Sequence, residues 1–270
     1  MEWSKEFVAE ALGVAGRDLI DEGFTIVPEY EEDTIHRFRV ATKKLRALLR
    51  LVEASQPDEV SSKLPKKFKN LYSLSGDVRD GQLMTKRAAE TEATDYADWL
   101  RQRTETAKEA FGTFYDSAIL VKLGKKLRKI EPQPLALETL KAFFAERFTA
   151  IEGILAKEPL EEEDLHEIRK QVKDLQHISK IVKEYWPEGL DAAGITAALK
   201  GMEKLAQRAG DFNDQHNALV SLEAFMETTP PTAATQALYE AWEGEKNKDR
   251  QKLVEEITAF KEAGKSSLTA

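Results

Sequence analysis

The chain has 270 residues, of which 41% are hydrophobic and 33% are charged, and this length is sufficient to bury a sizeable core. The 48 Asp and Glu outnumber the 40 Lys and Arg, so the net charge of −8 excludes a generally basic nucleic-acid coat protein but not a local basic patch. The absence of cysteine excludes disulfides, thiolate metal sites and cysteine nucleophiles.

The sequence has no apolar run that approaches the roughly eighteen residues needed for a membrane-spanning helix. Its first residues include Glu2, Glu6 and Glu10, whereas a secretory signal would have a basic start and an uninterrupted apolar stretch. We therefore expect a soluble, cytoplasmic protein that makes no contact with a membrane.

Helical periodicity runs through nearly the whole chain and is interrupted mainly at prolines. The segments between the prolines are rich in Ala, Leu, Glu, Lys and Arg, which favour helices, and none shows the alternation typical of a strand. The fold class predicted is therefore all-α. The expected helices are 3–22, 33–54, 58–75, 77–111, 114–130, 135–157, 163–185, 191–209, 212–228 and 232–264.

Two segments that lie 130 residues apart align without a gap. The first is EEDTIHRFRVATKKLRALLRLV (31–52) and the second is EEEDLHEIRKQVKDLQHISKIV (161–182). A second pair follows in the same order, SGDVRD (75–80) and AGDFND (209–214), with an offset of 134 residues. The matching order indicates that the chain contains two copies of one helical unit.

The segment Pro132-Gln133-Pro134 separates the two copies. We predict a single, internally duplicated domain over residues 1–270, with one helical bundle in 1–131 and a second in 132–270. Each half is expected to be a four-helix bundle, and 114–130 is expected to be an extra helix at the end of the first. The two bundles are expected to be related by a pseudo-twofold axis.

The first repeated helix carries like charges along one face. Steps of three and four residues place the following on one stripe: His36, Arg39, Lys43, Arg46 and Arg50. Lys44 flanks the stripe, and no acidic residue occurs between positions 35 and 52. The apolar residues that should pack into the core are Ile35, Phe38, Leu45, Leu48, Leu49 and Val52. Stacked like charges cost stability, which favours an anionic partner over an ordinary solvated face.

The second repeated helix has a weaker form of the same stripe. Its equivalent positions hold His166, Arg169 and Lys173. Asp174 and Gln176 replace the cations Lys44 and Arg46 of the first copy. We expect His177 to compensate in part, because an imidazole can donate a hydrogen bond to phosphate and protonates more readily beside an anion.

Residues near the Gly-Asp segments complete the candidate site. Lys69 and Arg79 are expected to lie near a helix junction close to the stripe, whereas the basic cluster at 122–129 is better explained as a solvated helix end. Gly76 and Gly210 are interpreted as residues that end helices. Their neighbouring aspartates, Asp77, Asp80, Asp211 and Asp214, are interpreted as helix-capping residues rather than metal ligands.

At these residues the sequence resembles the CHAD family, named for conserved histidines in an α-helical domain. The family pattern His-x-x-Arg-Val-x-x-basic-basic-Leu-Arg is matched by His36, Arg39-Val40 and Lys43-Lys44-Leu45-Arg46. The later Leu-Gly-x-x-Arg-Asp element is matched by Ser75-Gly76-Asp77-Val78-Arg79-Asp80. The signatures of the second half are matched by Leu165-His166, Arg169, Lys173-Asp174-Leu175-Gln176-His177, Gly210 and Asn213-Asp214.

The resemblance covers nearly the whole chain and implies two four-helix bundles about a pseudo-twofold axis, with a basic surface or pore between them. It also implies binding of inorganic polyphosphate and an association with polyphosphate granules. Some family members carry a catalytic domain with a Glu-x-Glu-x-Lys motif, and the run Glu243-Gly244-Glu245-Lys246 has the wrong spacing for it. Because Asp174 and Gln176 depart from the family pattern, the resemblance supports binding by the first half more firmly.

Polyphosphate suits a row of cations, since it offers charge but no base edges to read. Nucleic acid fits less well, because aromatic platforms are missing among the cations. The sequence therefore predicts a polyphosphate-binding protein without catalysis and without a cofactor, whose oligomeric state is open. The binding residues expected are His36, Arg39, Lys43, Lys44, Arg46, Arg50, Lys69, Arg79, His166, Arg169, Lys173 and His177.

Three alternatives remain open at this stage. Glu163-x-x-His166 matches one element of a di-iron bundle, but the surrounding arginines and lysines would repel a metal cation. A phosphohydrolase would need a glycine-rich phosphate loop, a nucleophile–base pair or a carboxylate cluster for magnesium, and none is evident. The terminal segment 232–264 could instead be a partner surface of a protein- or nucleic-acid-binding scaffold.

Overall fold

The computed structural model describes the backbone of residues 1–198 and 201–268, and helices account for most of it. The all-α prediction is confirmed. The small exception within these residues is a pair of two-residue antiparallel strands, β1 (Glu2–Trp3) and β2 (Leu135–Ala136), which ties the start of the chain to the start of its second half.

The helices of the first half are α1 (Lys5–Phe24), α2 (Glu32–Ser55), α3 (Lys66–Ala88), α4 (Thr94–Phe114) and α5 (Ser117–Leu127). Those of the second half are α6 (Leu137–Leu155), α7 (Glu162–Tyr185), α8 (Pro187–Ala192), α9 (Ile195–Ala198), α10 (Met202–Thr228) and α11 (Ala233–Leu268). The two aligned segments thus form α2 and α7, which both have 24 residues and start 130 positions apart.

The expected helix ends at the two Gly-Asp segments are wrong. Gly76 lies inside α3 and Gly210 lies inside α10, so Asp77 and Asp211 cap neither helix. The reason at Gly76 is a close tertiary approach, because a Cβ there would lie 2.8 Å from Nη1 of Arg39. A glycine in a helix costs stability, and here it makes room for a neighbouring guanidinium.

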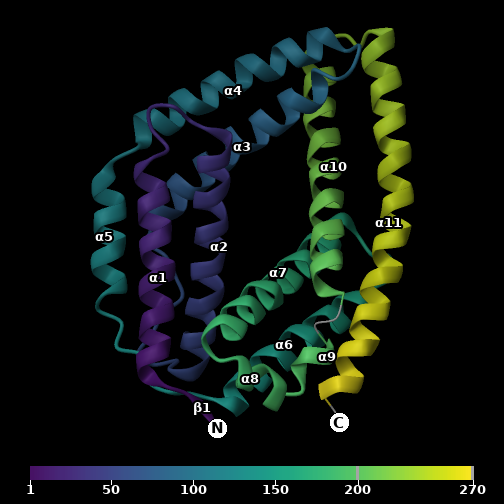
Figure 1. Cartoon of the computed structure of the whole chain (residues 1–270). Coiled ribbons are helices and arrows are strands. Elements are labelled where there is room, and N and C mark those ends of the chain that lie inside the picture. Colours follow the sequence, from purple (N-terminus) through teal and green to yellow (C-terminus); the bar gives the residue numbers. More distant parts are fainter. Residues whose placement is uncertain (199–200, 269–270) are drawn as a thin grey trace.

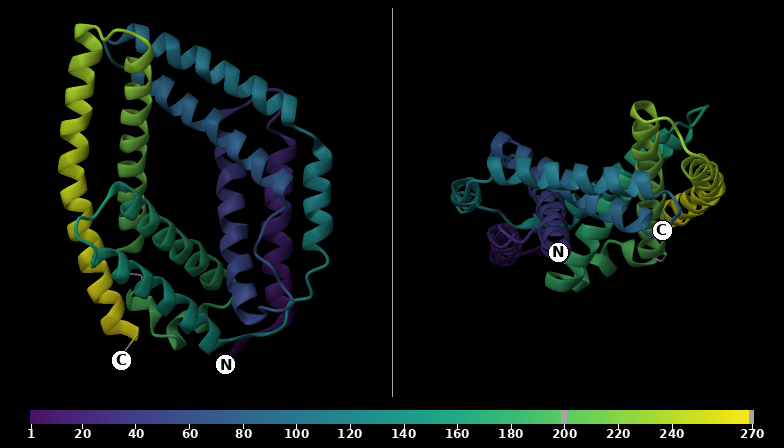
Figure 2. Two further views of the ribbon diagram at one scale, coloured as in Figure 1. Left: turned by 180° about the vertical axis from the view of Figure 1, so that it is seen from behind. Right: turned by 90° about the horizontal axis from the view of Figure 1, so that it is seen from above.

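The helices form a closed frame (Figure 1). α1, α2 and α5 stand along one side, and α10 and α11 stand along the other. The antiparallel pair α3 and α4 spans the top, while α6 to α9 lie across the base. Figure 2 shows the same closed arrangement from behind, with α2 and α10 on opposite sides of the opening.

Two separate apolar clusters hold the frame together. The larger one joins the α1–α2–α5 side to the base and includes the fully buried Trp3, Phe38 and Phe144. The smaller one lies where α3 and α4 meet α10 and α11, and its Tyr96 ring centroid is 5.4 Å from that of Phe225. The polar interior of the protein therefore lies between two regions of hydrophobic stabilisation.

The helix α2 buries the face that its periodicity predicts. All six expected core residues are buried: Ile35, Phe38, Leu45, Leu48, Leu49 and Val52. Its basic stripe is consequently turned away from this core, on the side where α2 contacts α7. Within the described part of the chain, no helix combines the length and apolarity that crossing a membrane requires.

Candidate functional site

A cavity of about 840 Å³ lies between α2, α3, α6, α7 and α10. Its cations are Arg39, Lys43, Arg46, Arg50, Arg79, Arg147, Arg169, Lys170 and Lys173. Its acidic residues are Asp80, Glu146, Glu167, Asp174, Asp211 and Asp214. Nine cations against six carboxylates leave a formal excess of three positive charges in a protein whose net charge is −8. The cavity is therefore a local exception to the overall acidity.

Ten of the twelve predicted binding residues line this cavity: His36, Arg39, Lys43, Arg46, Arg50, Arg79, His166, Arg169, Lys173 and His177. Lys44 and Lys69 do not, and both side chains are exposed. Lys44 directly follows Lys43 and is therefore rotated by about 100° around the helix axis. Lys69 lies one turn before Tyr72, the first residue of α3 to line the cavity.

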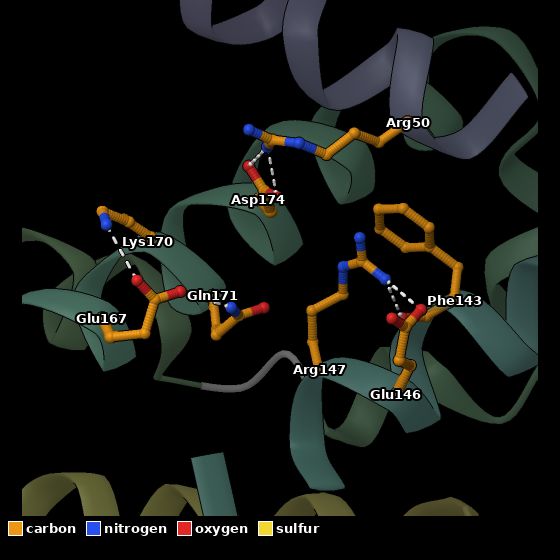
Figure 3. Close-up of polar contacts among 8 residues, drawn as sticks. All are labelled: Arg50, Phe143, Glu146, Arg147, Glu167, Lys170, Gln171 and Asp174. Atoms are coloured by element: carbon orange, nitrogen blue, oxygen red, sulfur yellow. Dashed lines mark hydrogen bonds and ion pairs between the residues drawn. The ribbon is translucent and has the colours of Figure 1, made fainter. Parts of the chain in front are cut away.

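Arg147 is the principal site residue that the sequence analysis missed. It comes from α6, where its guanidinium carbon lies 3.5 Å from the centroid of the Phe143 ring and its Nη1 lies 2.6 Å from a carboxylate oxygen of Glu146 (Figure 3). Only 9% of Arg147 is exposed. The available signal was an arginine at a core-facing position between Phe144 and Phe148.

Arg39 is held in place by the first turns of α3. Its Nη1 donates to the carbonyl oxygen of Tyr72 at 3.0 Å and to Oγ of Ser75 at 3.3 Å. Its guanidinium carbon also lies 4.7 Å from the centroid of the Tyr72 ring, a cation–π distance. These partners are neutral, so the contacts that position Arg39 do not offset its positive charge with a carboxylate.

Five of the nine cavity cations have no carboxylate within ion-pair distance among the residues described. They are Arg39, Lys43, Arg46, Arg169 and Lys173. Four come from α2 and α7 at positions that the repeat aligns in pairs, Arg39 with Arg169 and Lys43 with Lys173. The two stripes thus both contribute unpaired cations to the lining of one cavity.

Lys43 lies deepest in this unpaired set. Burial lowers the pKa of its ammonium to about 8, and the positive charges of Arg169, Arg39 and Lys173 act in the same direction. Burial likewise lowers the pKa of Lys173, with Arg169 again contributing. Both shifts mean that the folded protein holds these charges at a cost, which an anion in the cavity would relieve.

The three cavity histidines have different surroundings. His36 and His166 are exposed, and Nδ1 of His166 lies 2.7 Å from Oδ1 of Asn213. His177 is 8% exposed, and burial, reinforced by Lys173, lowers its pKa to about 3. His177 is therefore neutral near pH 7 and supplies no positive charge. Its Nε2 has no hydrogen-bond partner within the described chain.

Three of the four aspartates in the two Gly-Asp segments line the cavity instead of capping helices. Asp80, Asp211 and Asp214 all line it. Burial raises the pKa of Asp80, and the nearby charges of Asp214 and Asp77 add to that effect, whereas Arg39 opposes it. Over residues 1–198 and 201–268, no three His, Asp or Glu side chains come together in a metal-binding group.

The comparison with protein families decides the identity of the fold. The model of the CHAD domain matches residues 26–223, about three quarters of the chain. The chain belongs to the CHAD domain family. Every residue that lines the cavity lies between positions 36 and 217, so the cavity is built entirely from the part that matches the family.

Two solved structures resemble this CHAD protein over nearly all of its length. The CHAD domain from the plant Ricinus communis aligns with a TM-score of 0.72 and 15% identity, covering 97% of this chain and 93% of that one. PptA from Streptomyces chartreusis aligns with a TM-score of 0.63 and 11% identity, covering 99% of both chains. At these identities the likeness concerns the fold. A search of curated proteins finds no match.

Asp174 gives this CHAD domain an asymmetric cavity. Arg50 Nη1 lies 2.6 Å and 2.5 Å from the two carboxylate oxygens of Asp174, a contact that links α2 to α7 (Figure 3). Burial raises the pKa of Asp174, although the charges of Arg50 and Arg147 oppose the shift. Asp174, which stands where the first copy has Lys44, is thus a carboxylate that neutralises Arg50 at one end of the first basic stripe.

Proposed function

We propose that this CHAD domain binds inorganic polyphosphate in its cavity and performs no chemistry on it. The observation that carries the proposal is the set of five unpaired cavity cations, which are Arg39, Lys43, Arg46, Arg169 and Lys173. Uncompensated like charges at this density destabilise a fold, and a polyanion is the partner that would offset that cost.

The geometry of α2 suits a chain of phosphates. Cations at positions 39, 43 and 46 are about one helical turn apart, near 5.4 Å along the axis, so several can contact successive units of one polymer. Arginine can bind two phosphate oxygens with its planar fork, while lysine acts as a mobile point charge. Both helices supply both types to the cavity, α2 with Arg39 and Lys43 and α7 with Arg169 and Lys173.

Binding without catalysis is the form of the proposal that the residues favour. A divalent metal that could activate a phosphate would meet a cavity lining with nine cations and six carboxylates, a formal excess of three positive charges. The histidines do not form an obvious acid–base pair with a nucleophile, since His166 contacts Asn213 and His177 is neutral and buried. A cytoplasmic location at polyphosphate granules belongs to the same proposal.

We also infer that the two halves, 1–131 and 132–270, are copies of one unit related by a pseudo-twofold axis. Support comes from the equal lengths of α2 and α7 and from the unbroken 130-residue offset between them. Further support is that α3 and α10 each bring a Gly-Asp segment to the same cavity. In this interpretation each half of the site contributes one basic stripe.

The test is a titration of long-chain polyphosphate against the full chain at rising salt, with single-stranded DNA and RNA as competitors and released phosphate assayed in parallel. The proposal expects salt-sensitive binding that nucleic acid does not displace, with no phosphate released. The double variant Arg46→Gln/Lys173→Gln should lose about 100-fold in affinity, since each charged contact contributes on the order of 1.5–3 kcal/mol.

The matched control for that variant is Lys5→Gln/Lys183→Gln, which removes two exposed cations that do not line the cavity. It should bind polyphosphate like the parent protein. Equal affinities for both double variants would refute a cavity site, and steady release of phosphate by the parent protein would refute binding without chemistry.

A further inference from the structure

A second group of cations lies on the outside of the protein, away from the cavity lining. We call it the outer basic surface, and its members are Lys63, Lys66, Lys67, Lys69, Lys122, Lys125, Lys126, Arg128 and Lys129. All nine are exposed. They come from two segments that are distant in sequence, and Nζ of Lys126 joins these segments by donating to the carbonyl oxygen of Lys63 at 2.7 Å.

The structure shows no carboxylate partner for these nine cations among the residues it describes. Within the part of the chain that the structure describes, none lies within 4 Å of an acidic oxygen. Neither 60–76 nor 117–130 contains an acidic residue, although the chain has 48 of them. The dipole of α5 accounts for lysines in its last turn but not for the equal concentration of lysines before and within the first turn of α3.

The helix α3 connects the outer basic surface to the cavity. Lys69 precedes Tyr72 by three residues, which is one turn on the same side of a helix. Tyr72 lines the cavity and is the residue whose ring and carbonyl oxygen hold Arg39. Cations therefore continue from the cavity, past Lys69, to the surface of α5 without an intervening acidic residue on this stretch of α3.

We propose that the outer basic surface is a second contact surface for the same polyphosphate molecule that occupies the cavity. The polymer would leave the cavity and run along α3 to reach this surface. This inference rests on the proposed function. It explains why five cations of the cavity and all nine of the outer basic surface have no carboxylate within ion-pair distance among the described residues. A short chain occupies the cavity alone, whereas a long chain engages both surfaces.

The chemistry of the outer basic surface favours a flexible polyanion over other anionic partners. Eight of its nine members are lysines, which act as mobile point charges and need no fixed geometry in the ligand. It has no aromatic member on which a base could stack. In α5, Leu120 and Leu123 are fully buried, and Val121 is its one exposed large apolar side chain among the described residues, at 42%. A single exposed valine is too little apolar surface for insertion into a lipid surface.

Two linked contact surfaces predict a dependence on chain length. When one polymer is already held in the cavity, its free part is presented to the outer surface at high effective concentration. Long-chain polyphosphate should therefore bind more tightly than tripolyphosphate by about 100-fold or more. Removing the outer cations should abolish most of this gain and leave the affinity for tripolyphosphate unchanged.

The experiment compares tripolyphosphate with long-chain polyphosphate, at fixed salt and on a per-molecule basis, for three forms of the full chain. These are the parent protein, the outer-surface variant Lys122→Glu/Lys125→Glu/Lys129→Glu, and the control Lys5→Glu/Lys183→Glu/Lys248→Glu. Both triple variants change the net charge equally, and all six positions are exposed and do not line the cavity. If the reversed charges prevent folding, the same two sets with glutamine repeat the comparison.

The proposal expects the outer-surface variant to lose at least about tenfold in affinity for the long chain only, while the control keeps the full gain. It is overturned if both variants retain the gain, or if both lose it equally through net charge. A loss of binding to phosphatidylserine vesicles or duplex DNA, with the long-chain gain intact, would also overturn it. Failure of every form to bind tripolyphosphate and the long chain would instead refute the proposed function itself.

Discussion

At the scale of one residue, Lys43 shows how a charge buried in a binding site lowers the stability of the folded protein. Its pKa falls from an ordinary 10.5 to about 8, chiefly through burial and then through Arg169, Arg39 and Lys173. Below pH 8 the ammonium is charged in both the folded and the unfolded chain, so the full cost is present and is on the order of 3 kcal/mol. This cost diminishes as the pH rises from 8 towards 10.5, where the unfolded chain binds more protons than the folded one.

Replacing Lys43 by methionine should therefore separate stability from function. The variant Lys43→Met keeps the unbranched stem and removes the charge, so we expect the free energy of unfolding at pH 7 to rise by up to about 3 kcal/mol. Affinity for polyphosphate should fall. Denaturant unfolding and polyphosphate titration at pH 7 check both outcomes, and a variant that is less stable than the parent would contradict this account of Lys43.

The pH dependence of binding follows from the same residue. Lys43 loses its proton above pH 8 in the free protein, so affinity for polyphosphate should decline between pH 8 and 9.5. The variant Lys43→Arg should remain charged over that range and should show a smaller decline. Titrations of both proteins at constant ionic strength test this, and parallel pH profiles would show that Lys43 does not set the dependence.

At the scale of the helix, α2 and α3 fit together through Arg39 and Gly76. The guanidinium of Arg39 is fixed by Tyr72 and Ser75 and passes over Gly76 with no room for a Cβ. Gly210 is the aligned residue of α10, where a Cβ would meet no atom within 4 Å. Two glycines at the same place in the repeat therefore have different structural roles.

These two positions form a matched pair of variants. Gly76→Ala should displace Arg39 and weaken polyphosphate binding by about tenfold, the value of one charged contact. Gly210→Ala should instead stabilise the protein by about 0.5–1 kcal/mol, because it improves helix propensity without a clash. Thermal unfolding and binding titrations measure both effects. Loss of affinity in Gly210→Ala but not in Gly76→Ala would show that the close approach at Arg39 is unimportant.

At the scale of the whole molecule, the cavity exists because the frame is closed at two places. The larger apolar cluster joins the α1–α2–α5 side to the base, and the smaller cluster joins the ends of two helix pairs. In the smaller cluster Tyr96 packs on Phe225 at 5.4 Å and on Trp242 at 6.3 Å between ring centroids. This corner closes the frame of helices seen in Figure 1.

Truncation of Phe225, which is 2% exposed, should loosen this corner selectively. Phe225→Ala is expected to cost about 3–5 kcal/mol of packing in the smaller cluster. Hydrogen exchange should then quicken where α3 meets α4 and where α10 meets α11, while α2 and α7 stay protected. Phe144→Ala in the larger cluster is the control and should reduce protection in α2 and α7. Uniform loss of protection in Phe225→Ala would mean that the frame unfolds as one unit.

The sequence by itself determined the helical class, the boundaries of α2 and α7 to within a few residues and most of the cations that line the cavity. It did so because helix periodicity is local: positions three and four apart must share a face whatever surrounds them. The same logic identified Phe38 and Leu45 as core residues.

Only the tertiary structure decided which charges are neutralised and which remain unpaired. Asp174 was recognisable as a departure from a basic pattern, yet its pairing with Arg50 joins residues 124 positions apart and depends on how α2 and α7 cross. Gly76 was interpreted as a helix end because glycine commonly has that role. The structure instead explains the glycine by the Arg39 side chain of another helix, which leaves no room for a Cβ. Electrostatic partners and close approaches are long-range contacts, and periodicity carries no information about them.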